Sequence, residues 1–481
     1  MKKSFKRAGV AVLSMAMLLS MGAVGAMTAN AAYSDKWTVT ADTNLPTATF
    51  AVYQVADGGH KPTSQFTSVL ADKAAVEALN SSTVAGIADK LQGKATTVYN
   101  SYSAVDLGTE VDLENGYYLV IVDTKKGDFI AQPILVQVNN DTPADASVKV
   151  TQITLDKSIT AADGATTYSN SESADIHVGS VVDYQITTVI PKYSKTDNAG
   201  NAITALDTHF QIKDVPTNVK YNTGTLVVTY GASNTEVAAS NYTLTEEDNG
   251  FKIVFNDSFV LNDTYAGETL KLAYKSTVQA GAYTETTANP NTATLTFDTD
   301  YIQDGTPSPS TKDDKCNVYA ASLDVKKINA STNAAIPNVE FTLQDSSDTY
   351  IKIDGTVGTS TDKLVTDSSG EIHITGLGVG TYTLTEVAVP DGFVEPASKV
   401  MTVTISPATS GTFNGTYTIA STNSIASVSG KEVTVKNTPV GALPGTGGMG
   451  TVLFTVGGAA IVLLAGALFV VYMRKRKADE E

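Results

Sequence analysis

The residues that most directly suggest chemistry stand near the C-terminus, in the motif LPGTG. They are Leu443, Pro444, Gly445, Thr446 and Gly447. Proline and glycine favour a bent, extended backbone that resists packing into regular structure. The motif therefore predicts an exposed segment that a protease-like cleft can reach.

An apolar segment follows this motif. Residues 451–473 carry no charge and are long enough to cross a bilayer as a helix. The basic residues at 474–477 favour the cytoplasmic side of a membrane. The sequence thus predicts a transmembrane helix that holds LPGTG at the outer face.

The N-terminus predicts export. Residues 2–7 include four basic side chains, an apolar stretch follows, and Ala29 and Ala31 satisfy the small-residue rule for cleavage. We expect residues 1–31 to be a signal peptide that is removed after Ala31. Residues 32–446 should then face outward.

The composition excludes some partners and one form of reinforcement. The chain has 33 basic and 50 acidic residues, a net charge of −17, and the signal peptide contributes only basic charges. An exported part this acidic repels nucleic acid and anionic lipid, so neither is an expected partner. Cys316 is the only cysteine, so no internal disulfide can form. Covalent reinforcement would need another chemistry.

Residue spacing predicts no enzyme site and no metal site. The histidines are scattered without zinc-like spacing to cysteine, at His60, His177, His209 and His373. No serine or cysteine has a recognisable nucleophile motif or a neighbouring base. We therefore expect no cofactor, no metal and no turnover of an external substrate.

Short strands make up most of the exported chain. Segments of alternating apolar and polar residues recur at 116–123, 224–230, 251–255, 293–297, 380–387 and 431–437. Many short strands at regular spacing indicate β-sandwiches or barrels. Helical spacing predicts one or two short helices within 68–94, through Val69, Val76, Leu79, Ile87 and Leu91.

Two breaks divide the exported chain. Residues 139–147 separate two strand-rich blocks, and 303–317 has the proline, serine and aspartate content of a linker or long surface loop. We expect an N-terminal domain at 32–148, a second domain with a linker-like tail at 149–319, a third domain at 320–440 and the C-terminal tail at 441–481.

The LPGTG motif, the apolar span and the basic tail together resemble the LPXTG cell-wall sorting signal of Gram-positive surface proteins. The resemblance implies cleavage by a sortase between Thr446 and Gly447. The Thr446 acyl group then passes to an amine, so the membrane helix is a temporary tether.

Residues 320–440 resemble the CnaB-type domains of Gram-positive pilins and adhesins. The likeness rests on SLDVKKINASTNAAIPNVEFTLQD, YTLTEVAVPDGF and KEVTVKNTP. In that family a first-strand lysine bonds covalently to a last-strand asparagine, assisted by a buried acid. The resemblance places these residues at Lys327, Asn437 and Glu386. Lys326 should point to the opposite face of its strand.

Residues 149–319 resemble the D2, CnaA-like domain of major fimbrial subunits. The likeness rests on 177–193, 209–224 and 289–297. It implies a second bond with Lys157 as nucleophile, Asp214 as acid and Asn291 as electrophile, again in first-strand, central and last-strand order. Asn289 is the alternative to Asn291, and Glu268 the alternative to Asp214.

The residue types make this chemistry intelligible. A lysine buried in an apolar core loses its proton more readily and becomes a nucleophile. A neutral carboxylic acid in the same pocket polarises the asparagine carboxamide and shuttles protons. Ammonia leaves, and an isopeptide bond joins two strands without a cofactor. Such a bond can carry a pulling force, as disulfides do elsewhere.

The amine that receives the sortase-bound acyl group should lie near the junction of the first two domains, where shaft subunits commonly carry a YPK-like motif. This sequence departs from that pattern, since 139–157 contains no YPK. Lys149 occupies the matching location. Lys192, within IPKY, is the alternative, although it also fits a strand of the second domain.

Together the resemblances imply a mainly β protein. Tandem Ig-like β-sandwich domains, CnaA-like and CnaB-like, would follow an α+β N-terminal domain and precede a C-terminal transmembrane helix. The implied function is the major shaft subunit of a pilus. Its partners would be a pilin-type (class C) sortase, identical subunits head to tail, minor tip and base pilins, and peptidoglycan through a housekeeping sortase. The alternative is a singly wall-anchored adhesin or minor pilin that binds a host ligand.

Overall fold

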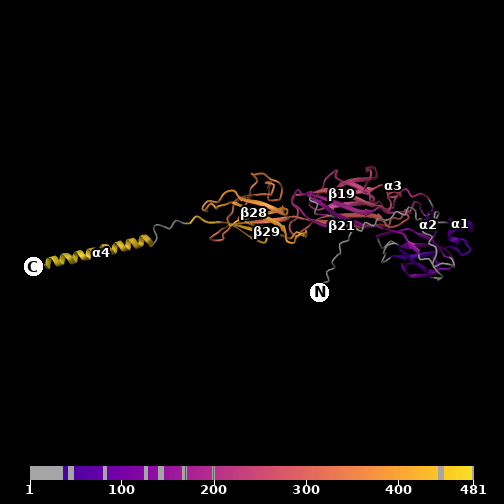
Figure 1. Cartoon of the computed structure of the whole chain (residues 1–481), viewed down its shortest axis with the longest axis horizontal. Helices are drawn as coiled ribbons and strands as arrows, with labels where there is room; N and C mark the ends of the chain where they lie inside the picture. Colours follow the sequence, from indigo (N-terminus) through magenta and orange to yellow (C-terminus); the bar gives the residue numbers. More distant parts are fainter. Residues whose placement is uncertain are drawn as a thin grey trace. The chain divides into compact units, whose positions relative to one another are not determined.

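The computed structural model describes residues 36–41, 48–79, 84–123, 128–138, 146–164, 168, 171–197, 199, 201–441 and 449–478. Apart from residues 413–415, the chain forms one unit up to Ala320 and a second from Ala321. Strands dominate both units (Figure 1), which confirms the mainly β prediction. The predicted signal peptide at 1–31 and the motif at 443–447 lie outside the described residues.

The first unit opens with two small sheets, of order β4-β1-β8 and β3-β2-β5-β7. Their strands are β1 Lys36–Ala41, β2 Thr49–Asp57, β3 Val105–Asp106, β4 Glu110–Asp112, β5 Gly116–Asp123, β7 Ile134–Val138 and β8 Ala146–Val148. The helices α1 (Lys73–Glu77) and α2 (Val84–Gln92) bury Val76 and Leu91 in one apolar cluster with Leu119. The helical segment expected within 68–94 is therefore confirmed.

A larger β-sandwich follows in the same unit. Its sheets have the orders β10-β12-β19-β15-β16, with β14 also on β19, and β11-β21-β20-β13-β18-β17. The strands of the first sheet are β10 Leu155–Ala162, β12 Val181–Val189, β14 Val219–Tyr221, β15 Val227–Tyr230, β16 Thr235–Glu236 and β19 Thr269–Val278. Those of the second are β11 Ser173–Asp175, β13 Gln211–Pro216, β17 Tyr242–Glu247, β18 Gly250–Phe255, β20 Asn289–Asp298 and β21 Pro309–Tyr319.

Buried side chains at alternate positions of the strands pack these two sheets together. Every second residue of β12 is buried, and β20 repeats this pattern over most of its length. Inward side chains from both sheets, such as Ile186 and Leu295, join one apolar core. The unit also contains β6 Phe129–Ala131, β9 Val150–Gln152, which pairs with β6, and α3 Asp257–Val260.

Residues 303–308 form no helix or strand, as expected of a loop, whereas the expectation of a linker or loop is wrong for 309–317, which belong to the strand β21. The strand β21 pairs antiparallel with β20 along most of its length, and its end pairs with β11. Pro309 opens the strand, where a missing N–H is tolerated. From Pro309 to Lys315 the strand alternates between exposed and half-buried positions, and both kinds carry the polar residues that suggested a linker. The family order also implied that Asn291 lies on the last strand of this sandwich. It does not, because β21 follows β20.

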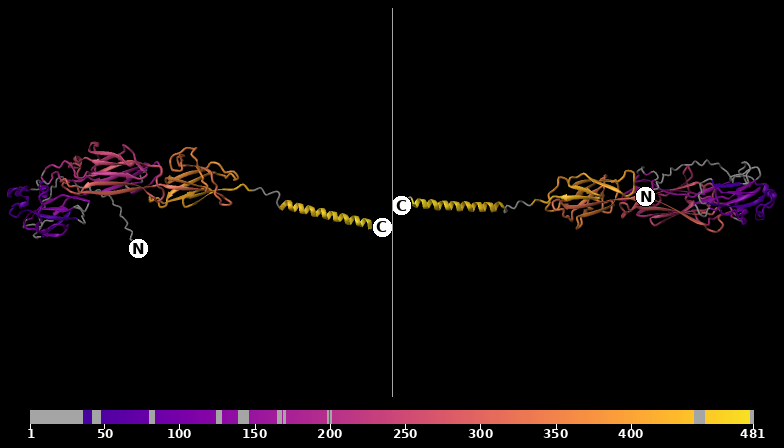
Figure 2. Two further views of the ribbon diagram at one scale, coloured as in Figure 1. Left: turned by 180° about the vertical axis from the view of Figure 1, so that it is seen from behind. Right: turned by 90° about the horizontal axis from the view of Figure 1, so that it is seen from below.

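The second unit is a smaller β-sandwich. Its sheets have the orders β26-β22-β31-β30 and β24-β23-β27-β28-β29, with β25 also on β23. The first contains β22 Ala321–Asn329, β26 Glu371–Leu377, β30 Ala426–Ser429 and β31 Glu432–Asn437. The second contains β23 Glu340–Gln344, β24 Tyr350–Ile351, β25 Leu364–Val365, β27 Gly380–Glu386, β28 Val400–Pro407 and β29 Tyr417–Ser421. Strands β28 and β29 appear in orange in Figures 1 and 2.

The helix α4 (Met449–Ala478) follows, so the segment expected to span a membrane is helical. Its side chains are described for 457–473 only. Among the helical residues as described, no stretch is long and apolar enough to cross a membrane. The transmembrane span at 451–473 stays a prediction.

The burial of Cys316 in β21 makes a testable prediction. Its side chain is fully buried, and burial raises the thiol pKa to about 12. Since the thiolate is the reactive form, we expect iodoacetamide to alkylate the native chain at least roughly 100-fold more slowly than the denatured chain. Whole-protein mass spectrometry reads this residue alone, because the chain has no other cysteine. Rapid alkylation of the native chain would restore the loop interpretation.

Candidate functional site

In the second unit, the structure brings together the lysine, acid and asparagine expected from sequence. Lys327 lies on β22, Glu386 ends β27 and Asn437 ends β31. The Lys327 Nζ lies 2.6 Å from Asn437 Oδ1 and 3.0 Å from Glu386 Oε2. The Asn437 Nδ2 donates to Glu386 Oε1 at 2.8 Å. The three side chains therefore form a closed ring of contacts inside the sandwich.

Strand register creates this arrangement. The parallel strands β22 and β31 place Asn329 opposite Asn437. Lys327 lies two residues before Asn329, so it shares a face with it, and Lys327 and Asn437 both point into the core. Glu386 comes from the other sheet, where it pairs with Phe341. Lys326 is on the other face, as expected, and forms an exposed ion pair with Glu371.

Burial sets the chemistry of this group. Lys327 is 0% exposed, and its removal from water lowers the amine pKa, although the Glu386 carboxylate opposes that shift. The Phe341 ring lies 6.0 Å from Nζ. An amine with a lowered pKa spends more time in the neutral, nucleophilic form.

The sandwich of the first unit holds a second set. Lys157 on β10 is 1% exposed, and its Nζ contacts both Asp214 Oδ1 and the hydroxyl of Tyr274. The Asn291 Nδ2 donates to the same Tyr274 hydroxyl at 3.1 Å. Lys157 and Tyr274 belong to one sheet and Asp214 and Asn291 to the other. Strands β13 and β20 pair Pro216 with Asn291, which puts Asp214 and Asn291 on one face.

The structure also separates the alternatives left open by sequence. The Asn289 side chain is bound elsewhere, since it accepts from Tyr283 N at 2.7 Å and donates to Val318 O at 3.1 Å. Glu268 is partly exposed at the turn before β19. Asn291 and Asp214 are the members of each pair that share the buried cluster with Lys157.

Tyr274 is the residue that sequence reasoning missed. It lies at an inward position of β19, where every second residue is buried. That alternation predicts a core aromatic but not a hydroxyl aimed at Lys157. Two oxygens of this cluster, Asp214 Oδ2 and Asn291 Oδ1, are buried and have no hydrogen-bond partner within the described chain.

The two candidate acceptor lysines lie at different places. Lys149 is half-buried between β8 and β9, and its carbonyl accepts from Gln132 N at 3.0 Å. Lys192 is exposed just after β12. Burial raises the pKa of Asp89 on α2, and the nearby Lys192 ammonium partly opposes that shift. The choice between them stays a prediction.

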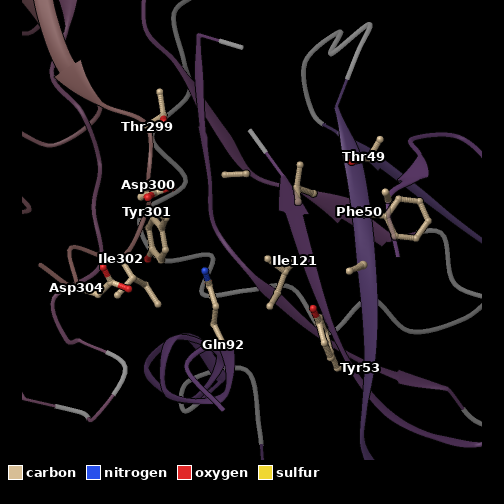
Figure 3. Close-up of a pocket in the computed structure, with 14 residues that line it drawn as sticks. Thr49, Phe50, Tyr53, Gln92, Ile121, Thr299, Asp300, Tyr301, Ile302 and Asp304 are labelled. Carbon is tan, nitrogen blue, oxygen red and sulfur yellow. The ribbon is translucent and has the colours of Figure 1, made fainter. Parts of the chain in front are cut away.

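A pocket of about 400 Å³ lies between the N-terminal sheets and residues 299–304 of the same unit. Figure 3 shows Gln92 and Tyr301 facing each other across it. Asp89 lies nearby and accepts from Ser194 Oγ at 3.0 Å and from the Tyr301 hydroxyl at 3.5 Å. No group of histidine, cysteine and acidic residues within the described ranges could hold a metal ion.

Two known families match segments of the chain that lie after residue 320. Residues 321–422 match SpaA, a prealbumin-like fold domain. Residues 435–480 match the LPXTG cell wall anchor motif. The predicted sorting signal and the predicted cell-surface location are thereby confirmed. No curated protein sequence matches the chain.

Three solved structures of pilins are similar to the chain. The T6 backbone pilin of serotype M6 Streptococcus pyogenes is 14% identical, with a TM-score of 0.53 over 86% of this chain and 100% of that chain. The major pilin subunit BcpA of Bacillus cereus is 15% identical, with a TM-score of 0.46 over 84% and 99%. SpaD from Corynebacterium diphtheriae is 14% identical, with a TM-score of 0.46 over 85% and 97%. The T6 match confirms the multi-domain sandwich architecture.

Burial of the Asp89 carboxyl should make the stability of the first unit depend on pH. Burial raises its pKa to about 6, above the ordinary value of 3.8. The folded state is therefore penalised for ionising Asp89, and stability is lost as the pH rises from about 4 to above about 6. We expect Asp89→Asn to be more stable than the wild type by about 1–3 kcal/mol at pH 7, and similar to it at pH 4. Thermal melts across this range measure the difference.

Asp106→Asn is the matched control, because that aspartate is exposed in the same region. Its melts should follow the wild type at every pH. Parallel curves for Asp89→Asn and the wild type would contradict the raised pKa of Asp89.

Proposed function

We propose that this chain is the structural shaft subunit of a covalently polymerised pilus and supports adhesion. One observation carries the proposal: two sandwiches in succession each bury a lysine, an acid and an asparagine in one hydrogen-bonded cluster, ahead of a cell-wall anchor motif. In the first unit, the Tyr274 hydroxyl links Lys157 to Asn291. The matching backbone pilins are structural proteins, and the chemistry proposed here is intramolecular. Each bond forms once per chain.

In the second unit, Lys327 and Asn437 form an isopeptide bond. The Lys327 ammonium gives its proton to Glu386, and the neutral amine attacks Cγ of Asn437. The Nζ–Cγ bond forms, Glu386 gives its proton to Nδ2 and takes one from Nζ, the Cγ–Nδ2 bond breaks, and the amide nitrogen leaves as ammonia. The contacts of Glu386 with both nitrogens support its role as proton carrier.

In the first unit, Lys157 and Asn291 form the second bond, with Asp214 as the acid. Two orphan oxygens support this assignment. Protonated Asp214 would place a hydrogen on Oδ2, and Asn291 Oδ1 is a buried acceptor without a partner in the described chain. A neutral acid that donates there polarises the carboxamide for attack.

These bonds would help a pilus shaft to withstand tension. In the second unit β22 is the first strand and β31 the last, and they run parallel. A pull between the ends of this unit shears the two strands past each other. A Lys327–Asn437 bond passes the force directly from β22 to β31. The strands that lie between these two in the sequence then carry none of the force.

Polymerisation uses the sorting motif. A pilin-type sortase cleaves between Thr446 and Gly447 and transfers the Thr446 acyl group to Lys149 of the next subunit, with Lys192 as the alternative acceptor. Minor pilins occupy the tip and base. A housekeeping sortase joins the completed shaft to peptidoglycan.

The bond in the second unit is tested by Lys327→Met. This variant cannot release ammonia from the pair at 327 and 437. We therefore expect its measured mass to exceed, by one ammonia, the mass calculated for a variant chain that carries the bond. The joined peptide carrying residues 327 and 437 should be lost. Since the bond closes a loop of 110 residues, its loss should cost about 4–5 kcal/mol of unfolding free energy.

Lys326→Met is the matched control, because it removes the neighbouring lysine from the outer face. It should keep the joined peptide and the wild-type melting temperature. Absence of the joined peptide from the wild type would refute the bond itself.

Polymerisation is tested on cell-wall extracts boiled in detergent and blotted for this protein. We expect the wild type to give a ladder of high-mass species and Lys149→Ala to collapse it to monomer. Lys192→Ala should leave the ladder unchanged. A ladder that survives Lys149→Ala but not Lys192→Ala would reassign the acceptor. A single wall-linked species in the wild type would replace the shaft with a singly anchored adhesin or minor pilin.

A further inference from the structure

The two buried sets differ in how they hold the nitrogen that must leave. In the second unit, Glu386 contacts both nitrogens, with Oε2 at 3.0 Å from Lys327 Nζ and Oε1 at 2.8 Å from Asn437 Nδ2. In the first unit, Asp214 contacts Lys157 and interacts with the Tyr274 hydroxyl, but it makes no hydrogen bond to Asn291 in the described chain, and its second oxygen has no partner there. There the asparagine Nδ2 donates to the hydroxyl of Tyr274 instead.

We propose that Tyr274 is a catalytic residue of the Lys157–Asn291 reaction, relaying a proton from the attacking amine to the departing amide nitrogen. The inference deepens the proposed function and rests on it. Its basis is that one hydroxyl oxygen contacts both reacting nitrogens, Lys157 Nζ and Asn291 Nδ2.

The step balances without any further reactant. Asp214 first takes one proton from the Lys157 ammonium. The neutral amine then attacks Cγ of Asn291, passing a proton to the Tyr274 oxygen as that hydroxyl gives its own proton to Nδ2. The Nζ–Cγ bond forms, the Cγ–Nδ2 bond breaks, ammonia leaves, and Tyr274 ends as it began.

A phenol suits this role because it accepts and donates at one atom. The side chain of Tyr274 is fully buried, and burial raises the pKa of its hydroxyl well above the ordinary value. It therefore does not act as a phenolate base, and the concerted relay keeps it neutral. The ring is fixed by stacking on Tyr184, with centroids 5.5 Å apart, and by edge contact with Phe251 at 5.0 Å.

Tyr274→Phe tests the relay, with Tyr184→Phe as the matched control. Tyr184 offers a similar ring, 5.0 Å from Lys157 Nζ against 5.1 Å for Tyr274. Burial raises the pKa of its hydroxyl, and the nearby Asn291 side chain opposes that shift. That hydroxyl contacts neither reacting nitrogen at hydrogen-bond distance in the described chain. The full chain is made by cell-free synthesis and quenched at intervals, and the joined tryptic peptides are quantified by mass spectrometry.

We expect Tyr274→Phe to slow formation of the Lys157–Asn291 peptide by roughly 100-fold or more, as loss of a general acid–base typically does. Tyr184→Phe should stay within a few-fold of the wild type. The Lys327–Asn437 peptide, formed in the other sandwich of each sample, is the internal clock and should not change.

The outcomes separate the two proposals. If the wild type joins Lys157 to Asn291 and Tyr274→Phe does so at the same rate, the relay is overturned and the bond stands. If the wild type lacks this peptide, both fail in this sandwich.

Protease digestion shows whether the Tyr274→Phe chain folds. If it does not fold, a second variant with difluorotyrosine at position 274 is used instead. That residue keeps the ring shape and the hydroxyl but makes the phenol more acidic. A changed rate supports the relay, whereas an unchanged rate reduces Tyr274 to a packing role.

Discussion

The burial of two lysine amines is the constraint on which the rest of this structure depends. An isolated ammonium in an apolar core is too costly to keep, so each needs a carboxylate in contact. Lys157 and Lys327 both have one, and both side chains are inaccessible to solvent. Conversion to an amide removes the charge altogether. Each proposed bond would therefore remove a buried charge, and burial would supply part of the driving force for it.

The two proposed bonds reinforce the sandwiches in different ways. In the second unit, Lys327 and Asn437 lie on neighbouring strands of one sheet, and the acid comes from the facing sheet. In the first unit, Lys157 and Asn291 lie on facing sheets, so their bond joins the two layers. One link resists sliding of paired strands, and the other resists separation of the sheets. In both, the partners are more than one hundred residues apart, so the fold must form before the chemistry can.

The sequence allowed much of this to be predicted, for identifiable reasons. Alternation located β18 and β27 because their buried faces need apolar residues at every second position. The reactive residues came from family resemblance, since a single lysine among the chain's many basic residues has no distinguishing pattern. The strand β21 was missed because its exposed face carries the polar residues of a linker. Tyr274 was missed because alternation identifies a buried ring but not the target of its hydroxyl.

The length of the acid explains why one site needs a tyrosine and the other does not. Glutamate reaches one methylene farther than aspartate, and Glu386 spans the gap between two nitrogens with its two oxygens. Asp214 stands on the strand beside that of Asn291 and contacts the opposing lysine, but its other oxygen contacts neither nitrogen by hydrogen bond in the described chain. A second group must then connect amine and amide, and an aromatic from the lysine's own sheet can do so. The choice of acid on one strand thus constrains the residue on another, a coupling that follows from reach and not from sequence proximity.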